Sequence, residues 1–234
     1  GKVRDRLITV KPDGSNEPDL ETIGHLTTNR LSALDIIWCE VPFKGEVLTA
    51  MDREMVLKLK ARSSAFRFDT IAYGRDIQPY MPEDLRDRLD LQRRVTVAQL
   101  CDPINVEVIP RGYLTGGGYK EYLRTAPNHS VSGVPLSPGL HDGDELSEPA
   151  GTASTKAEEG HDEYIDIKTV DPAVVALAME LYKAAREIAK ALNVIIADAK
   201  LEFGNRNGCL VCIDERFTPD SSRFWGLVAW LASR

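Results

Sequence analysis

The chain has 234 residues, of which 43% are apolar, so it can bury the core of one large domain or of two small lobes. Its net charge of -7 argues against a nucleic-acid partner, because binding to nucleic-acid phosphates normally requires a basic stripe. The longest apolar run near an end, residues 224–232, is about half as long as a bilayer crossing requires. We therefore expect a soluble, cytoplasmic protein with no membrane partner.

Residues 1–100 show short patterns that are typical of strands. The chain begins at Gly1 without an initiator methionine, directly before a charged motif, and we expect a leader to precede it. Residues 7–10, 22–26 and 95–97 are β-branched or alternate between polar and apolar, and turn signals such as Asp13-Gly14 separate them. These patterns predict a β-rich N-terminal lobe.

Residues 101–234 predict a mixed lobe of strands and one long helix. Residues 105–109 are a strand candidate, and residues 127–163, rich in Gly, Pro, Ser, Asp and Glu, predict a long surface loop. The Asp171-Pro172 pair predicts the start of a helix that runs to about Leu192, and residues 194–197 suit a buried strand. The expected buried stripe of this helix consists of Val174, Ala178, Leu181, Ala185, Ile188 and Leu192. Strands, a loop, a helix and further strands predict an α+β protein with two lobes.

A dense group of acids and bases surrounds a predicted hairpin near the C-terminus. Its turn is Asn207-Gly208, the strongest short hairpin signal, because both central positions of a type I′ turn need positive φ. Folding the strands back there places Glu202 and Asp214 on neighbouring rungs, with the register open by one residue, and Asp198 and Lys200 on one face. Two acids for a divalent ion, a lysine and a further acid suit metal-assisted phosphoryl transfer. The alternative is a solvated strand face with surface ion pairs.

Two of the four cysteines form the C-x-x-C pair Cys209 and Cys212, a pattern found in zinc and redox sites. In a strand, a separation of three residues sends the two side chains to opposite faces. We therefore expect buried, reduced thiols rather than a zinc site.

Seven segments carry a resemblance to a known family: residues 1–5, 28–35, 44–49, 106–116, 154–163, 198–204 and 213–225. In this order they resemble the SAICAR synthetase (phosphoribosylaminoimidazole-succinocarboxamide synthase) family over nearly the whole chain. The resemblance implies a two-lobed α+β fold with the active-site cleft between the lobes. Residues 1–100 would form a β-rich nucleotide-binding lobe, and residues 101–234 an α+β lobe with the metal, phosphoryl-transfer and substrate residues.

The resemblance implies an ATP-dependent amide ligation in de novo purine biosynthesis, with ATP and Mg²⁺ as cofactors. ATP would activate the carboxylate of 5-amino-4-carboxyimidazole ribonucleotide as an acyl phosphate. The amine of L-aspartate would then displace phosphate to give SAICAR. The chemical reason is that a carboxylate is a poor electrophile until its oxygen becomes a good leaving group.

The resemblance also assigns roles to individual residues. Catalysis would involve Lys156, Asp162, Asp198 and Lys200, with Glu107 also lining the carboxylate and amine ends of the reaction. ATP would be bound by Gly1, Lys2, Arg4 and Glu107. The ribonucleotide would be bound by Arg111, Gly117, His161, Ser222 and Arg223, the two arginines clamping its phosphate. Glu202 and Asp214 would hold Mg²⁺. The plainer alternatives are a surface pair for Arg223, an ordinary loop residue at His161 and a flexible turn at residues 116–118.

Several positions depart from the resemblance on the azole and phosphate side, among them Gln99 and Leu100, which stand where the family often has two lysines. Gly117 stands where the family usually has a serine whose hydroxyl points toward the substrate phosphate. Asn29 replaces the aspartate of Thr-Asp-Arg, and Tyr164 stands where asparagine often follows His-Asp-Glu. Two alternatives to the purine ligase therefore stay open: a paralogue that ligates an amine to another azole or nucleoside carboxylate, and a non-catalytic nucleotide-binding homologue. The sequence also leaves open whether the chain forms a homo-oligomer.

Overall fold

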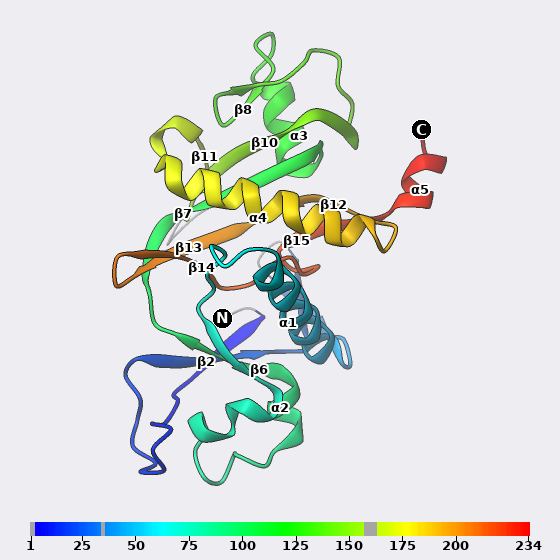
Figure 1. Ribbon diagram of the computed structural model, residues 1–234. Coiled ribbons are helices and arrows are strands. Elements are labelled where there is room, and N and C mark those ends of the chain that lie inside the picture. Colours follow the sequence, from blue (N-terminus) through cyan, green and yellow to red (C-terminus); the bar gives the residue numbers. More distant parts are fainter. Residues whose placement is uncertain (1–2, 34–35, 157–162) are drawn as a thin grey trace. The chain divides into compact units, whose positions relative to one another are not determined.

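The computed structural model describes residues 3–33, 36–156 and 163–234 (Figure 1). The chain divides into two compact units, and each unit is made of two separate stretches of the chain. The first contains residues 1–56 and 68–102, and the second contains residues 57–67 and 103–234. Both units contain helices and strands, which confirms the predicted α+β class. Within the described residues, no helix is long and apolar enough to cross a membrane.

The first unit is built on an antiparallel sheet with the strand order β1-β2-β6-β5. These strands are β1 (Arg4–Leu7), β2 (Thr22–Thr27), β6 (Val95–Gln99) and β5 (Thr70–Tyr73). The other elements are the hairpin of β3 (Arg30–Ala33) and β4 (Ile36–Glu40), the 3-10 helix η1 (Gly74–Tyr80), α2 (Leu89–Arg94) and most of α1 (Lys44–Arg62). Ile77, Val95 and Val97 are fully buried in its core.

The strands predicted at residues 22–26 and 95–97 are confirmed, but the one predicted at residues 7–10 is wrong. The chain pairs at Arg4–Leu7 instead, and Val10 forms only an isolated bridge with Pro18. Helix α1 was also missed, because its buried face is not apolar throughout. Asp52 is 3% exposed and lies between Leu48 and Val56, so the polar residue interrupts the stripe that periodicity would detect.

The second unit contains an antiparallel sheet with the order β11-β10-β7-β12-β15, to which the hairpin of β13 and β14 is attached. Its strands are β7 (Asp102–Leu114), β10 (Asp144–Thr155), β11 (Tyr164–Ile165), β12 (Val194–Ala199), β13 (Leu201–Arg206), β14 (Cys209–Ile213) and β15 (Ser222–Gly226). Two short strands, β8 (Ser130–Val131) and β9 (Val134–Pro135), form a separate hairpin. The helices are α3 (Gly116–Arg124), η2 (Ile167–Thr169), α4 (Pro172–Lys190) and α5 (Leu227–Ala232).

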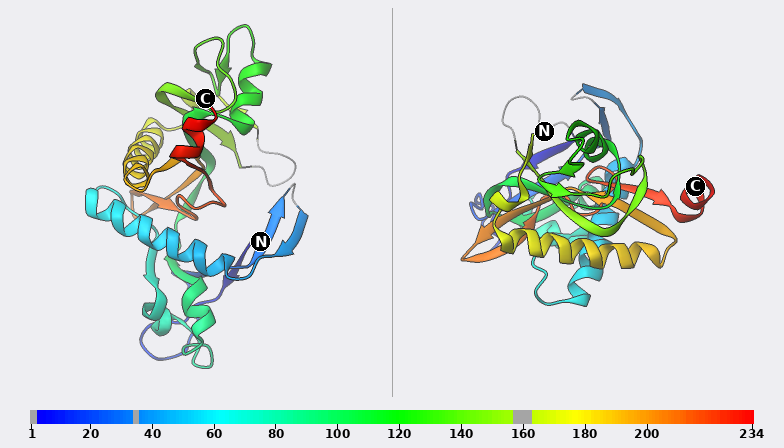
Figure 2. Two further views of the ribbon diagram at one scale, coloured as in Figure 1. Left: turned by 90° about the vertical axis from the view of Figure 1, so that its right-hand side faces the viewer. Right: turned by 90° about the horizontal axis from the view of Figure 1, so that it is seen from above.

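Helix α4 lies along one face of this sheet, as both views in Figure 2 show. It begins where the sequence predicts, and the Asp171 side chain accepts a hydrogen bond from the amide of Ala173 (2.8 Å). The predicted stripe from Val174 to Ile188 is buried. Its last predicted member, Leu192, is 69% exposed, because the helix already ends at Lys190.

The long surface loop predicted over residues 127–163 is wrong in its second half. Strand β10 occupies Asp144–Thr155 and pairs with β7 up to the rung Thr155 with Val106. Its residues are mostly small or polar and have little preference for a strand on their own. The strand forms because β7 provides the hydrogen-bonding partner, so tertiary context overrides local preference.

The predicted C-terminal hairpin is confirmed. Asn207 and Gly208 have φ values of 51° and 74°, as a type I′ turn requires. Strand β13 then pairs with β14 from Arg206 with Cys209 to Glu202 with Ile213, so Asp214 is one residue beyond the Glu202 rung. Cys209 is half-buried in β14, whereas Cys212 is fully buried.

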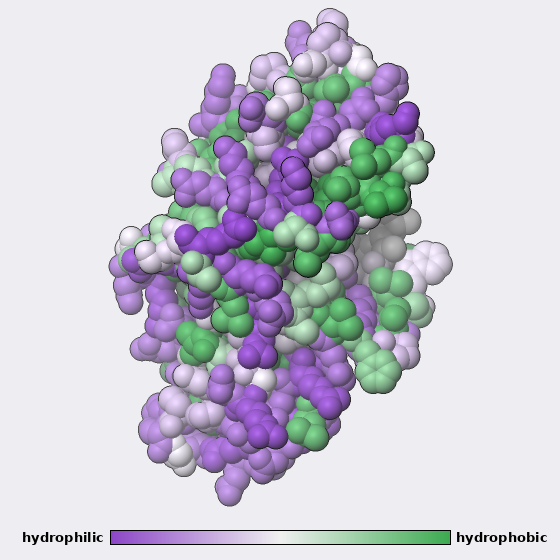
Figure 3. Space-filling view, turned by 45° about the vertical axis from the view of Figure 1, so that its right-hand side comes forward, coloured by the Kyte–Doolittle hydropathy of each residue, from purple (hydrophilic) through white to green (hydrophobic). Residues whose placement is uncertain are grey.

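Exposed apolar side chains occur among the polar ones on the surface. The face in Figure 3 mixes hydrophobic and hydrophilic residues. In the first unit, Ile36, Ile37 and Trp38 of β4 are exposed.

Candidate functional site

A pocket of about 390 Å³ lies in the second unit, and several predicted site residues line it. Its walls come from β7, the first turn of α3, β11, β12, β15 and the loop before β15. The lining residues are Ile109, Arg111, Gly117, Tyr164, Asp198, Lys200, Pro219, Asp220, Ser221, Ser222 and Arg223. Of the residues predicted from the sequence, the pocket thus brings together Arg111, Gly117, Asp198, Lys200, Ser222 and Arg223.

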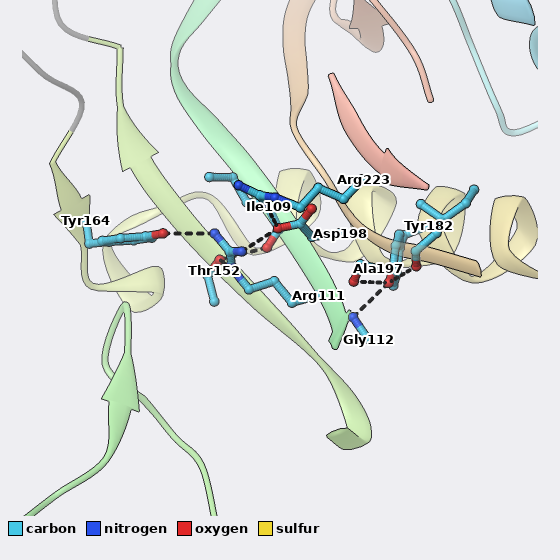
Figure 4. Close-up of polar contacts among 10 residues, drawn as sticks. Ile109, Arg111, Gly112, Thr152, Tyr164, Tyr182, Ala197, Asp198 and Arg223 are labelled. Carbon is cyan, nitrogen blue, oxygen red and sulfur yellow. Dashed lines mark hydrogen bonds and ion pairs between the residues drawn. The ribbon is translucent and has the colours of Figure 1, made fainter. Parts of the chain in front are cut away.

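Strand pairing places a carboxylate between two guanidinium groups at this pocket. Asp198 of β12 is paired in register with Arg111 of β7 on one side and with Arg223 of β15 on the other. The Oδ2 atom of Asp198 accepts hydrogen bonds from Nη1 of Arg111 (2.6 Å) and from Nη1 of Arg223. In Figure 4 the three side chains point toward one another. Two cations thus share one anion, and the three groups together keep an excess positive charge.

The two arginines differ in their exposure and in their remaining partners. The Arg111 side chain is 3% exposed, and its other donors reach Oγ1 of Thr152 (3.1 Å) and the hydroxyl of Tyr164 (2.9 Å). Thr152 is held in turn because its hydroxyl donates to the carbonyl of Ile109 (2.7 Å). The Arg223 side chain is 48% exposed. Arg111 is therefore fixed in the sheet, and Arg223 is the cation that faces solvent.

Helix α4 fixes the two strands that carry this ion cluster. The hydroxyl of Tyr182, a fully buried residue, accepts a hydrogen bond from the amide of Gly112 (2.7 Å) in β7. The same hydroxyl lies 2.8 Å from the carbonyls of Ile196 and Ala197 in β12 and can donate to either (Figure 4). Gly112 is needed there, because a Cβ atom would lie 2.7 Å from the Tyr182 hydroxyl. One tyrosine thus holds β7 and β12 beside Arg111 and Asp198.

Gly116 and Gly118 let the two arginine side chains lie against the first turn of α3. A Cβ atom at Gly116, whose φ is +56°, would lie 2.5 Å from Arg223, and one at Gly118 would lie 2.9 Å from Arg111. The segment is a helical turn rather than the flexible turn considered from the sequence. The first amides of a helix have no acceptor within the helix, so this turn presents donors beside the two guanidinium groups.

A second cluster of charges adjoins the pocket at Lys200, between β12 and β13. The Lys200 ammonium donates to Oε1 of Glu107 and to Oε1 of Glu202, both at 2.7 Å. Lys156, which follows β10, donates to Oε2 of Glu202, and Ser154 lies 3.4 Å from Oε2 of Glu107. Both glutamates are 5% exposed, so two lysines neutralise two buried carboxylates.

The charge state of Lys200 follows from these neighbours. Burial by itself lowers the pKa of an ammonium group, because it disfavours the charged form. The negative charges of Glu202 and Glu107, and the hydrogen bonds to them, outweigh burial and raise the pKa of Lys200 above its ordinary value of 10.5. Lys200 is therefore a permanent cation near neutral pH.

Some predicted residues are not part of these two clusters. Arg4 lies in β1 of the first unit, and Asp214 lies just beyond β14, half-buried. Gly1, Lys2, His161 and Asp162 lie outside the described residues. Within the described part of the chain, no group of three or more His, Cys, Asp and Glu side chains is arranged to hold a metal ion.

Sequence reasoning did not identify Tyr164 and Thr152, the two residues that hold Arg111 beside Asp198. Tyr164 was noted only as a departure from the family pattern, yet its hydroxyl bonds Arg111 and it lines the pocket. Thr152 lies in the segment predicted as a loop. The available signal for Tyr164 was its position directly after the matched segment 154–163, whereas Thr152 became recognisable only once β10 was known to pair with β7.

Known proteins resemble this chain throughout. The family model for SAICAR synthetase matches residues 1–230. The phosphoribosylaminoimidazole-succinocarboxamide synthase of Neisseria meningitidis serogroup B is 38% identical over 236 residues, which cover 96% of this chain and 76% of that protein. The enzyme of the same name from Geobacter metallireducens is 38% identical over 210 residues, covering 86% of this chain and 68% of the relative. A solved structure of SAICAR synthase from Saccharomyces cerevisiae, complexed with SAICAR, matches 98% of this chain and 75% of its own with a TM-score of 0.80 and 32% identity.

Proposed function

Because the chain belongs to the SAICAR synthetase family, we propose that it joins 5-amino-4-carboxyimidazole ribonucleotide to L-aspartate in purine biosynthesis. ATP drives the reaction, and the products are SAICAR, ADP and phosphate. The observation that supports this assignment most directly is the pocket of the second unit, which Lys200 lines together with Asp198 and its two partners Arg111 and Arg223. The similar yeast enzyme has been solved with SAICAR bound, which agrees with a site for this product.

The arginine end of the pocket suits the phosphate of the ribonucleotide. Arg223 is half-exposed, so an incoming phosphate can replace Asp198 as its partner, while Arg111 stays held by its neighbours. The first turn of α3 adds backbone donors at Gly117, which lines the same pocket. Arginine suits this task, because its planar fork can donate two parallel hydrogen bonds to a phosphate.

The lysine end suits the activation of the carboxylate. A carboxylate oxygen of the ribonucleotide attacks the terminal phosphorus of ATP, and ADP leaves. The amine of aspartate then attacks the acyl carbon, the bond to phosphate breaks, and the nitrogen loses a proton. Lys200 remains charged throughout and therefore acts as a fixed cation that stabilises the transferred phosphoryl group, not as a proton carrier. Glu107 and Glu202 hold it in position.

Glu202, which lies beside Lys200, and Asp214, one residue beyond the rung of Glu202, would hold a Mg²⁺ ion, which would neutralise charge on the ATP phosphates. We assign Glu202 and Asp214 as its protein ligands, because carboxylate oxygens are the ligands that Mg²⁺ prefers. Glu202 already balances two ammonium groups, and one of them, Lys156, is half-exposed and can move aside. Mg²⁺ commonly uses one or two carboxylates and takes its other ligands from water and phosphate.

The assignment is tested by measuring ADP release in a coupled assay with ATP, Mg²⁺, the ribonucleotide and L-aspartate, and by omitting each substrate in turn. We expect ADP release that requires all of them. Release only with another azole carboxylate would identify a specialised paralogue instead. ATP binding without turnover on any azole carboxylate would identify a non-catalytic homologue, and both outcomes would reject the assignment.

A further inference from the structure

Gly117 and Tyr164, two positions at which the sequence departs from the family pattern, lie against each other in the pocket. A Cβ atom at Gly117 would lie 2.8 Å from the Tyr164 hydroxyl oxygen, a distance that real Cβ atoms do not show. The next atoms of the ring, Cζ and Cε2, would lie at 3.7 and 3.9 Å, which is ordinary contact. The hydroxyl oxygen is therefore the one atom of Tyr164 that a side chain at residue 117 would have to displace.

The backbone gives no reason of its own for a glycine at residue 117. Gly117 lies in the first turn of α3 and, unlike Gly116, does not have a positive φ. In a helix, glycine costs about 1 kcal/mol relative to alanine. The space beside Gly117 is thus used by Tyr164, which reaches it from β11.

The hydroxyl of Tyr164 has a proton to offer in this position. Its contact with Arg111 (2.9 Å) must be one in which the tyrosine oxygen accepts, because a guanidinium group has only donors. The described residues provide no acceptor for the hydroxyl proton, and the hydroxyl lines the pocket beside Arg111 and Gly117. Burial raises the pKa of Tyr164, so the group keeps this proton near neutral pH.

We propose that the Tyr164 hydroxyl is a substrate-binding and specificity-determining group that donates a hydrogen bond to the phosphate of the ribonucleotide, in the space that a side chain at residue 117 would otherwise fill. This inference rests on the proposed function, because it concerns how the same pocket holds that substrate. Arg111 orients the hydroxyl by donating to its oxygen. The phosphate is therefore bound by Arg111, Arg223 and Tyr164, and residue 117 of α3 contributes no side chain to its binding.

The first test is the Tyr164→Phe variant, which removes only the hydroxyl oxygen. We expect KM for the ribonucleotide to rise about 10-fold, the usual loss for a hydrogen bond to a charged group, while kcat and the KM values for ATP and L-aspartate stay near those of the wild type. The control substrate is the corresponding nucleoside, which lacks the phosphate. On this substrate we expect kcat/KM of Tyr164→Phe to equal that of the wild type. An equal loss on both substrates would overturn the proposal, because it would show that the contribution of Tyr164 does not depend on the phosphate.

The second test uses the steric relation with Gly117. In the wild type, Gly117→Ala should impair ribonucleotide binding, because its Cβ atom meets the Tyr164 hydroxyl. In the Tyr164→Phe background the same alanine should be tolerated, and Gly117→Ser should recover most of the lost affinity by supplying a hydroxyl from α3. Additive effects of the substitutions at the two positions would contradict the proposal, because groups that share one space must show coupling. Melting temperatures of all the variants identify any that fail to fold.

A binding measurement separates failure of this inference from failure of the proposed function. Absence of turnover by the wild type would reject the function itself, whatever Tyr164 does. Calorimetric titration with ribose 5-phosphate then tests the pocket alone, and we expect Tyr164→Phe to weaken this binding relative to the wild type. Equal binding by both proteins would overturn the role of Tyr164.

Discussion

Replacing Asp198 by asparagine tests how the pocket is held together. The Asp198 carboxylate is the anionic partner of Arg111, and both residues are almost fully buried, at 2% and 3% exposure. Without the carboxylate, the Arg111 charge keeps only the neutral partners Thr152 and Tyr164. Removing one member of a buried ion pair typically costs about 3–5 kcal/mol, and we expect the free energy of unfolding of Asp198→Asn to fall by about that amount.

The matched control is Arg223→Gln, which breaks the other ion pair of the same carboxylate. The Arg223 side chain is 48% exposed, and Asp198 keeps Arg111 as its partner, so we expect a loss of no more than about 1 kcal/mol. Urea unfolding followed by tryptophan fluorescence measures both changes, since Trp225 and Trp230 belong to this unit. The reasoning is refuted if Asp198→Asn unfolds at the urea concentration of the wild type, or if Arg223→Gln loses as much stability as Asp198→Asn.

Three further outcomes are expected. Asp214→Asn should abolish Mg²⁺-dependent turnover and leave the circular dichroism spectrum unchanged, and a wild-type kcat over a Mg²⁺ titration would contradict its role as a ligand. The pKa of Lys200 is higher in the folded state than its ordinary value of 10.5 in the unfolded chain. The charged ammonium group therefore contributes its full stabilisation below pH 10.5, and this stabilisation is lost only as the pH rises through the folded-state pKa. The loss of stability in Lys200→Met should therefore be constant between about pH 6 and 9, and a loss that varies across this range would show that another group is involved. Gly208→Ala should lower the free energy of unfolding by about 1–2 kcal/mol. The cause is backbone strain alone, because φ is +74° and no atom lies within 4 Å of the new Cβ. An unchanged urea midpoint would disprove this account of the turn.

The parts of the fold that the sequence predicted are those fixed by local chemistry. The Asn207-Gly208 turn needs positive φ at both positions, and the Asp171-Pro172 pair provides the cap and the first residue of a helix. Each signal lies within a few residues of the structure that it specifies, so it could be recognised without knowing what packs nearby.

The parts that were missed depend on partners distant in the sequence. Strand β10 has a weak preference of its own and forms against β7, and α1 carries Asp52 within its buried face. The same holds for the candidate site. The charged residues around Lys200 were recognisable, but the contact of Tyr164 with Gly117 spans 47 positions and arises only when β11 and α3 meet at the pocket.

The most direct test of the account is to follow the oxygen atoms of the substrate carboxylate. The proposed reaction forms an acyl phosphate, so one carboxylate oxygen must leave with the phosphate when aspartate attacks. The ribonucleotide is labelled with heavy oxygen in its carboxylate and incubated with the protein, ATP, Mg²⁺ and L-aspartate, and the phosphate is analysed by mass spectrometry. We predict one labelled oxygen in phosphate for each SAICAR formed. Formation of SAICAR with unlabelled phosphate, or release of ADP without SAICAR, would contradict the account.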